Sequence, residues 1–308
     1  MNRLARTARA TLLASAATLL ALAAIELALR VLGLGRPILY DNRASYGYRP
    51  LPDQDVHRLR GAHVHVNHEG LRGPDPPDGA LRILFLGDSV TWGGSYVDDD
   101  DLFAAVAART LHERTAERFP AVAALDAGVN AWGPQNVLGL VTDRGGFGSP
   151  IWVLTLLDDD FRRDRTRIGE VPYFNVAPHT AIEELLVLGA YRLSTAYKRP
   201  KPDADVETIA STNLAACRAI AAAARAAGAR LLLVWHPTAP ALAGAGEAYK
   251  TRLLADAAAG GVPALDLTAA YGDGRGLYVD GMHLGIAGHR VAGRAIGDAL
   301  AALSGGER

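Results

Sequence analysis

Cysteine is nearly absent from this chain, since Cys217 is the only one among 308 residues. An internal disulfide is therefore excluded, and an exported form has to be stabilised by its core alone. Zinc-finger spacings and a P-loop are also missing, and the formal net charge of −1 gives no reason to expect a nucleic-acid partner. Apolar residues make up 49% of the chain, enough for a sizeable core in one large domain or two small ones.

One long apolar run stands near the N-terminus. It extends from Ala10 to Leu29, is interrupted only by Glu26, and follows three basic residues, Arg3, Arg6 and Arg9. Twenty helical residues span roughly 30 Å, the thickness of a bilayer core. The arginines predict a cytoplasmic N-terminus and export of the remainder. We therefore expect a cytoplasmic basic segment at 1–9 and a transmembrane anchor at 10–32.

A cleaved signal peptide is the alternative interpretation of this run. The tripeptide Ala21-Leu22-Ala23 resembles a small-residue cleavage site. The apolar run is long for a signal peptide and continues to Leu29, which favours retention as an anchor. A cytosolic amphipathic helix is not expected, because the run is apolar on every side.

The pattern after residue 80 is typical of an α/β domain. We interpret 33–80, rich in Pro, Gly and His, as a linker and pre-domain segment with a few short extended pieces. Short apolar runs then predict five buried strands, at Leu81–Leu86, Ala121–Leu125, Ile151–Leu157, Arg230–Trp235 and Ala264–Leu267. Helices are predicted by periodicity and capping residues at Leu102–Arg118, Pro134–Arg144, Asp205–Ala227, Glu247–Ala259 and Ile286–Leu303.

Alternation of strands and helices predicts one domain at 81–308, with a flavodoxin-like parallel sheet covered by helices on both faces. Residues 161–204 interrupt the alternation, and we interpret them as an insertion of loops with one short helix near Ile182–Tyr197. Four arginines between positions 162 and 167 are interpreted as a solvated loop, with contact to an acidic glycan as the alternative.

The first candidate for chemistry is the segment Gly87-Asp88-Ser89-Val90-Thr91, directly after the first strand. Ser89 is expected at the carboxyl end of that strand, the edge at which parallel sheets bind their ligands. The α/β-hydrolase elbow G-x-S-x-G is absent, because Thr91 occupies its last position. By itself, Gly-Asp-Ser is also typical of an ordinary turn.

The second candidate is Asp280-Gly-Met-His283, just before the last predicted helix. A serine hydroxyl is a poor nucleophile until a base removes its proton. His283 can do so if a carboxylate fixes its tautomer, and Asp280 is close enough in sequence for that role. Taken alone, the Asp and His three residues apart also fit a helix cap beside a surface histidine.

Together, a Ser after the first strand and a D-x-x-H before the last helix resemble the SGNH (GDSL-like) hydrolases. Further segments resemble a bacterial membrane-anchored branch of that family, in the same order along the chain. They are Ile25–Arg30 (the anchor ending), Asn67–Gly73 (N-x-x-G-[FL]-R-G), Leu81–Gly93 (R-I-L-x-L-G-D-S-x-T-x-G), Asp126–Gly133 (N-x-G-V-x-G-x-G), Leu156–Asp160 (L-N-D-D) and Asp280–Gly288 (D-x-x-H-x-x-x-x-G).

The resemblance implies a three-layer α/β/α fold and a catalytic triad in which Ser89 is the nucleophile, His283 the base and Asp280 its orienter. It also implies an oxyanion hole made by the N–H of the nucleophile, the N–H of a glycine in the second block and an asparagine side chain in the third. The aligned positions are occupied by Ala131 and Asp158.

Both substitutions bear on activity. Ala131 still supplies an N–H, although the backbone freedom of glycine is lost. Asp158 is the serious departure, because an ionised carboxylate cannot donate a hydrogen bond. Loss of one oxyanion donor typically costs roughly 10²–10³ in rate. Other donors nearby are alternatives for the hole, namely Gly128, Asn130 and Trp132.

The activity implied by the resemblance is hydrolysis of acyl esters, acetyl esters in particular, on an extracytoplasmic substrate such as an envelope or exopolysaccharide glycan. Polysaccharide O-acyltransfer with the same triad is an alternative, as is a catalytically weak, glycan-binding envelope protein. No metal or organic cofactor is implied. We expect a single-pass protein of the bacterial inner membrane with its catalytic domain in the periplasm.

Overall fold

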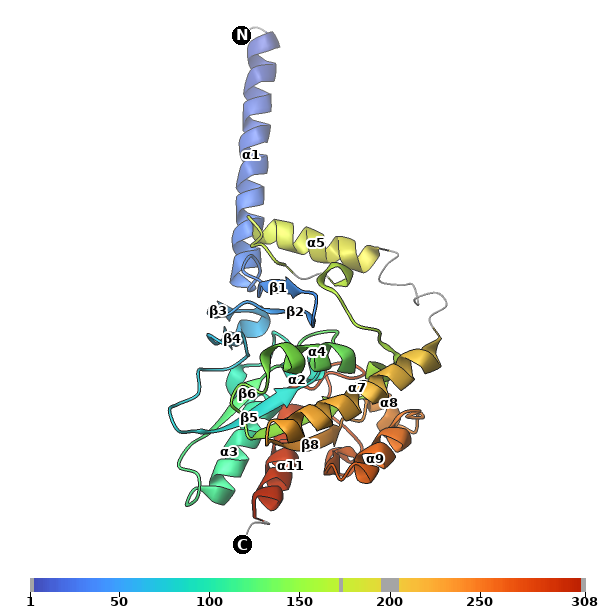
Figure 1. The fold of residues 1–308 in the computed structure, drawn as a ribbon. Coiled ribbons are helices and arrows are strands. Elements are labelled where there is room, and N and C mark those ends of the chain that lie inside the picture. Colours follow the sequence, from blue (N-terminus) through green and yellow to red (C-terminus); the bar gives the residue numbers. More distant parts are fainter. Residues whose placement is uncertain (1–2, 172–173, 195–204, 306–308) are drawn as a thin grey trace.

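The computed structural model describes residues 3–171, 174–194 and 205–305, and its centre is a parallel five-stranded sheet (Figure 1). The strands are β5 (Leu81–Leu86), β6 (Val122–Asp126), β7 (Ile151–Leu156), β8 (Arg230–Trp235) and β9 (Ala264–Asp266). They are ordered β6-β5-β7-β8-β9, and every neighbouring pair is parallel. In chain order this is 2-1-3-4-5, the doubly wound flavodoxin-like arrangement. The predicted fold class is confirmed.

Helices cover both faces of the sheet. One face carries α4 (Pro134–Arg144), α7 (Val206–Ala226) and α9 (Lys250–Ala259). The other face carries α3 (Phe103–Thr115) and α11 (Ile286–Gly305). The shorter helices are α2 (Ser89–Trp92), α8 (Ala239–Leu242), α10 (Thr268–Tyr271), η1 (Leu59–Gly61), η2 (Asp99–Asp101), η3 (Asp158–Arg162) and η4 (Ile168–Glu170).

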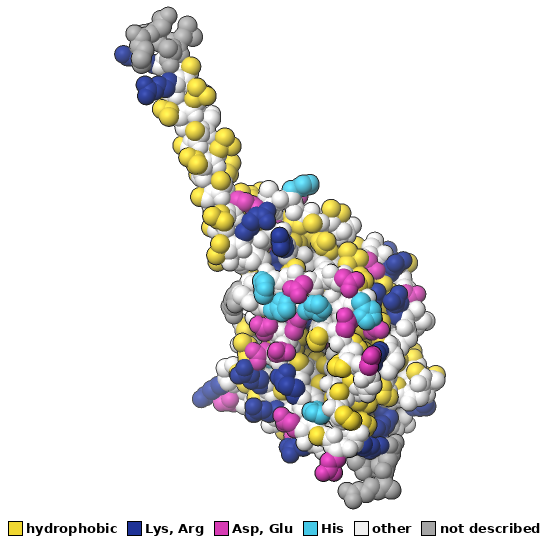
Figure 2. Space-filling view, turned by 90° about the vertical axis from the view of Figure 1, so that its left-hand side faces the viewer, with side chains coloured by type: hydrophobic (Ala, Val, Ile, Leu, Met, Phe, Trp, Pro, Cys, Tyr) yellow, Lys and Arg dark blue, Asp and Glu magenta, His cyan; other side chains and the backbone are white. Residues whose placement is uncertain are grey.

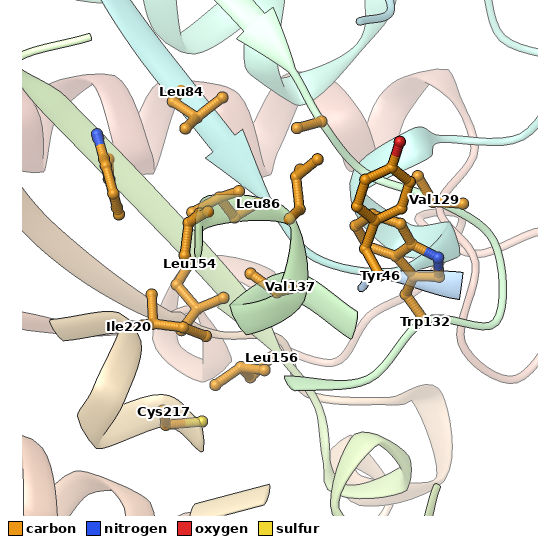
Figure 3. Close-up of a cluster of buried hydrophobic side chains, with 14 of the residues drawn as sticks. Tyr46, Leu84, Leu86, Val129, Trp132, Val137, Leu154, Leu156, Cys217 and Ile220 are labelled. Atoms are coloured by element: carbon orange, nitrogen blue, oxygen red, sulfur yellow. The ribbon is translucent and has the colours of Figure 1, made fainter. Parts of the chain in front are cut away.

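The core explains why β5 is apolar throughout. Side chains alternate along a strand, so Leu84 and Leu86 pack toward α4 and α7 while Ile83 and Phe85 pack toward α3 and α11. Figure 3 shows the first of these clusters, in which Leu154 and Leu156 of β7 lie between the β5 leucines and Ile220 and Cys217 of α7. Cys217 is buried there.

The segment 33–80 differs from the linker expected from its composition. It forms two antiparallel hairpins, β1 (Tyr40–Arg43) with β2 (Gly47–Pro50), and β3 (Gln54–His57) with β4 (His63–Val66). Tyr46 and Tyr48 are buried, and their rings lie 6.1 and 6.4 Å from the ring of Trp132. Burying these aromatic side chains makes the hairpins part of the core of the domain.

Helix α1 (Arg3–Val31) extends from the body, and its apolar side chains stand clear of it (Figure 2). Within the described residues, Arg6–Val31 is the one helical stretch long and apolar enough to cross a membrane, a test that a signal sequence also passes. Helix α5 (Ala181–Leu193) lies across the base of α1 (Figure 1). It is the short helix expected in the insertion; the predicted end at Tyr197 lies outside the described residues.

Candidate active site

Ser89, His283 and Asp280 lie together at the carboxyl edge of the sheet. Ser89 is the first residue of α2, directly after β5, and its Oγ lies 2.9 Å from Nε2 of His283. Nδ1 of the same ring lies 2.7 Å from Oδ2 of Asp280. Residues 194 positions apart in the chain thus form one continuous hydrogen-bond chain from hydroxyl to carboxylate.

The tight strand-to-helix turn before Ser89 depends on two neighbours. Asp88 caps α2, because its Oδ1 accepts a 2.8 Å hydrogen bond from the N–H of Val90. Gly87 has no room for a side chain, since a Cβ there would lie 2.2 Å from Oγ1 of Thr91. These contacts place the serine hydroxyl at the start of the helix.

Asp280 is held in its ionised form by its own loop. Burial raises the pKa of its carboxyl group, but hydrogen bonds from the backbone N–H groups of His283 and Met282 and from the His283 ring outweigh burial, so the pKa is lowered. An ionised Asp280 requires a proton on Nδ1 of His283. Nε2 is then free to accept the proton of Ser89, as a general base must.

Ala131 occupies the position that the family resemblance predicts for the oxyanion hole, and its backbone is unusual. Its φ of 60° is a left-handed conformation, which glycine adopts without strain and alanine does not. Among the described residues, the N–H groups of Ser89 and Ala131 have no hydrogen-bond acceptor. Gly128, one alternative donor, instead gives its N–H to Oδ1 of Asp126 at 2.7 Å.

The two other alternative donors, Asn130 and Trp132, lie against the N-terminal hairpin. The Asn130 side chain lies 3.5 Å from the hydroxyl of Tyr40, and its carbonyl accepts a hydrogen bond from the hydroxyl of Tyr48. Trp132 is buried against Tyr46 and Tyr48, and its indole N–H has no partner within the described part of the chain. The hairpin therefore shapes the loop that carries Ala131.

Asp158 makes contacts that the sequence did not predict. Its Oδ1 accepts a 3.0 Å hydrogen bond from the N–H of Tyr249, and its Oδ2 pairs with Arg162 at 3.0 Å. Both oxygens are therefore engaged as acceptors with groups outside the nucleophile turn. Its place in the oxyanion hole stays a prediction.

Arg163 is a member of the site that sequence reasoning missed. Its Nη1 lies 2.9 Å from Asp88, 3.1 Å from the carbonyl of Trp132 and 3.3 Å from Asp160. The interpretation of this arginine as part of a solvated loop is therefore wrong. It ties the nucleophile turn, the Ala131 loop and the end of β7 to one cation. The only signal in the sequence was that Arg163 lies three residues after the Leu156–Asp160 segment.

Two further buried residues, His236 and Arg72, hold the backbone next to the site by hydrogen bonds. His236, buried directly after β8, lies 2.9 Å by Nε2 from the carbonyl of Met282, and burial lowers its pKa to about 4. It is therefore neutral at pH 7 and supports the loop of His283. Arg72 is fully buried, pairs with Asp99 at 2.7 Å and donates to the carbonyl of Trp92 at the end of α2.

No family model and no curated protein matches the sequence. Solved structures with similar folds include LAE5, an alpha/beta hydrolase enzyme from the metagenome of Lake Arreo, at 14% identity and a TM-score of 0.48, covering 73% of this chain and 95% of that one. A catalytic mutant of an acetylxylan esterase from Geobacillus stearothermophilus is 12% identical, with 70% and 93% covered and a TM-score of 0.46.

A member of the lipolytic protein G-D-S-L family from Veillonella parvula is 14% identical, with 74% of this chain and all of the other covered, at a TM-score of 0.39. At these identities the similarity concerns the fold alone. What this chain does must therefore be argued from its own residues.

Proposed function

We propose that this chain is a serine ester hydrolase of the SGNH (GDSL-like) type. The observation that carries the proposal is the hydrogen-bond chain from Ser89 through His283 to Asp280, at the edge where doubly wound sheets bind ligands. Within the part of the chain that the structure describes, the N–H groups of Ser89 and Ala131 have no acceptor, which adds support because acyl transfer needs donors for a developing oxyanion.

The reaction follows from these positions. Oγ of Ser89 attacks the acyl carbonyl carbon while Nε2 of His283 takes the hydroxyl proton, and Asp280 stabilises the resulting imidazolium. The carbonyl oxygen becomes an oxyanion between the N–H groups of Ser89 and Ala131. When the intermediate collapses, the leaving alcohol receives the proton from His283. Water, deprotonated by the same ring, then hydrolyses the acyl-enzyme.

For the substrate, we propose acyl esters, acetyl esters in particular, on an extracytoplasmic glycan. The support is the N-terminal segment, because a basic N-terminus followed by an apolar helix favours a domain outside the cytoplasm by the positive-inside rule. Retention of α1 as an inner-membrane anchor is part of the proposal. N-terminal sequencing of membrane-extracted protein tests it, and a mature chain that begins near Ala24 would contradict it.

A fluorophosphonate probe on the purified full-length protein tests the nucleophile, because only an activated serine reacts with it. We expect labelling of the wild type and of Ser211→Ala, a surface control on α7, and none of Ser89→Ala. His283→Ala should also lose labelling at neutral pH. Equal labelling of wild type and Ser89→Ala excludes Ser89. A folded wild type that never labels favours the non-catalytic, glycan-binding alternative.

A further inference from the structure

Helix α5 is attached to the base of α1 through its N-terminus. The carboxylate of Glu26, the one charge within the apolar run, accepts hydrogen bonds from the N–H of Ala181 at 2.9 Å and of Ile182 at 3.1 Å. An anion at this position satisfies the unpaired N–H groups at the start of a helix. Glu26 interrupts the apolar run because its carboxylate caps α5.

The side of α5 that faces the body carries one buried charged residue, Glu184. Glu184 is only 1% exposed and pairs with Arg58 at 2.6 Å. Its other oxygen accepts a hydrogen bond from the N–H of Gly35, in the turn that follows α1. A buried, hydrogen-bonded ion pair fixes the rotation of α5 about its own axis, because turning the helix would leave both charges unpaired.

The opposite side of α5 is apolar and uncovered. At 100° per residue, the stripe opposite Glu184 is formed by residues without charge, namely Ile182, Leu186, Gly189 and Leu193. Leu186 is 65% exposed and Leu193 is 83% exposed, and Leu185 and Val187 beside them are also exposed. Among the described residues, nothing covers Leu186 and Leu193, and an exposed apolar stripe of this kind marks an interaction surface.

The position of α5 relative to α1 identifies that partner. Residues 10–25, between the last N-terminal arginine and Glu26, rise roughly 24 Å as a helix, about 6 Å less than the roughly 30 Å of a bilayer core. Glu26 then lies close to the outer boundary of the core, and α5, which it caps, lies at the same level. Figure 1 shows α5 across α1 on the side of the body from which α1 emerges.

We propose that α5 is an interfacial helix, whose apolar stripe of Ile182, Leu186, Gly189 and Leu193 inserts into the surface of the membrane that α1 crosses. The proposal rests on α1 being retained as an anchor. Such helices lie in the plane of the interface with the apolar face about 5–10 Å deep. Two attachments, one across the bilayer and one along it, hold the domain in a fixed orientation, which a single flexible tether does not.

Fluorescence quenching by brominated lipids in nanodiscs tests the proposal with the full chain. In a Cys217→Ala background, an environment-sensitive dye is attached to Leu186→Cys, to Leu19→Cys in α1 and to Glu117→Cys, an exposed position beyond α3. We expect quenching at 186 and 19 and none at 117. Quenching at 19 alone overturns the proposal and leaves the anchor intact. No quenching at 19 contradicts the anchor, and the proposal with it.

A second variant tests whether the apolar stripe itself is responsible. With the dye at Leu193→Cys, Leu186→Asp should reduce quenching several-fold, because a charge in the stripe opposes insertion. The same change at Val206, an exposed apolar residue at the start of α7, is the control and should have no effect. Unchanged quenching with Leu186→Asp overturns the proposal.

Discussion

On the triad side of the proposed active site, Ser89, Asp280 and His283 match the family pattern. The oxyanion side departs from it at Asp126, Ala131 and Asp158. The triad is assembled from two short segments, each of which is held by its own backbone hydrogen bonds. The oxyanion side depends on residues distant in sequence, the N-terminal hairpin and Arg163 among them. The local conformation of each triad segment is thus encoded nearby in the sequence, whereas the meeting of the two segments and the surroundings of the oxyanion depend on tertiary contacts.

The largest expected effect lies on the triad side. Asp280→Asn presents an amide N–H to Nδ1 of His283, so that the proton moves to Nε2 and the base is lost. We expect kcat for a short-chain ester to fall roughly 10⁴-fold, with the fold retained. Asp273→Asn, at an exposed position in the same region, is the control and should be unaffected. Equal rates for both variants would remove Asp280 from the triad.

The second-largest effect is expected on the free energy of unfolding and comes from Asp126, on the oxyanion side. Burial raises the pKa of Asp126 to about 8, although the N–H of Gly128 and the charge of Arg72 act in the opposite direction. Between about pH 4 and pH 8 the folded protein therefore keeps the carboxyl proton of Asp126, whereas the unfolded chain has released it. The free energy of unfolding consequently falls as pH rises through this range.

Asp126→Asn removes this dependence. We expect similar free energies of unfolding for both proteins near pH 5. At pH 8 the variant should be more stable by on the order of a few kcal/mol, measured by urea unfolding. Asp143→Asn, exposed on α4, should show no such divergence. A constant difference at all pH values would contradict a protonated Asp126.

Ala131→Gly addresses the strained position itself. Glycine adopts the observed φ of 60° without strain, so we expect the free energy of unfolding to rise by about 1 kcal/mol. The same change at Ala215, an exposed helical position on α7, should lower it by about 1 kcal/mol. Destabilisation in both variants would contradict a left-handed backbone at Ala131.

The smallest expected effect is that of Asp158→Asn. Both oxygens already accept hydrogen bonds, from Tyr249 and Arg162, so an amide gains no access to the oxyanion unless the side chain turns. We expect little change in esterase rate at pH 7. An increase of about tenfold or more would instead place residue 158 in the oxyanion hole and show that its charge slows the enzyme.

The sequence by itself determined the fold class and most element positions. Strands β5 and β8 were predicted with their observed bounds, because a strand buried on both faces is a continuous apolar run that ends where solvent begins. Helices such as α4 were found from periodicity with a proline at the start and a glycine at the end. The family motifs likewise pointed to Ser89, Asp280 and His283.

Only the tertiary structure decided what lies around these residues. The segment 33–80 was interpreted as a linker with a few short extended pieces because it is rich in Pro, Gly and His, yet Tyr46 and Tyr48 are buried against Trp132. Arg163 and Glu26 are charged residues that, besides near neighbours, contact groups far away along the chain. Composition and periodicity report which side chains avoid water. They do not report which distant groups a buried charge will pair with, because that depends on how the elements pack.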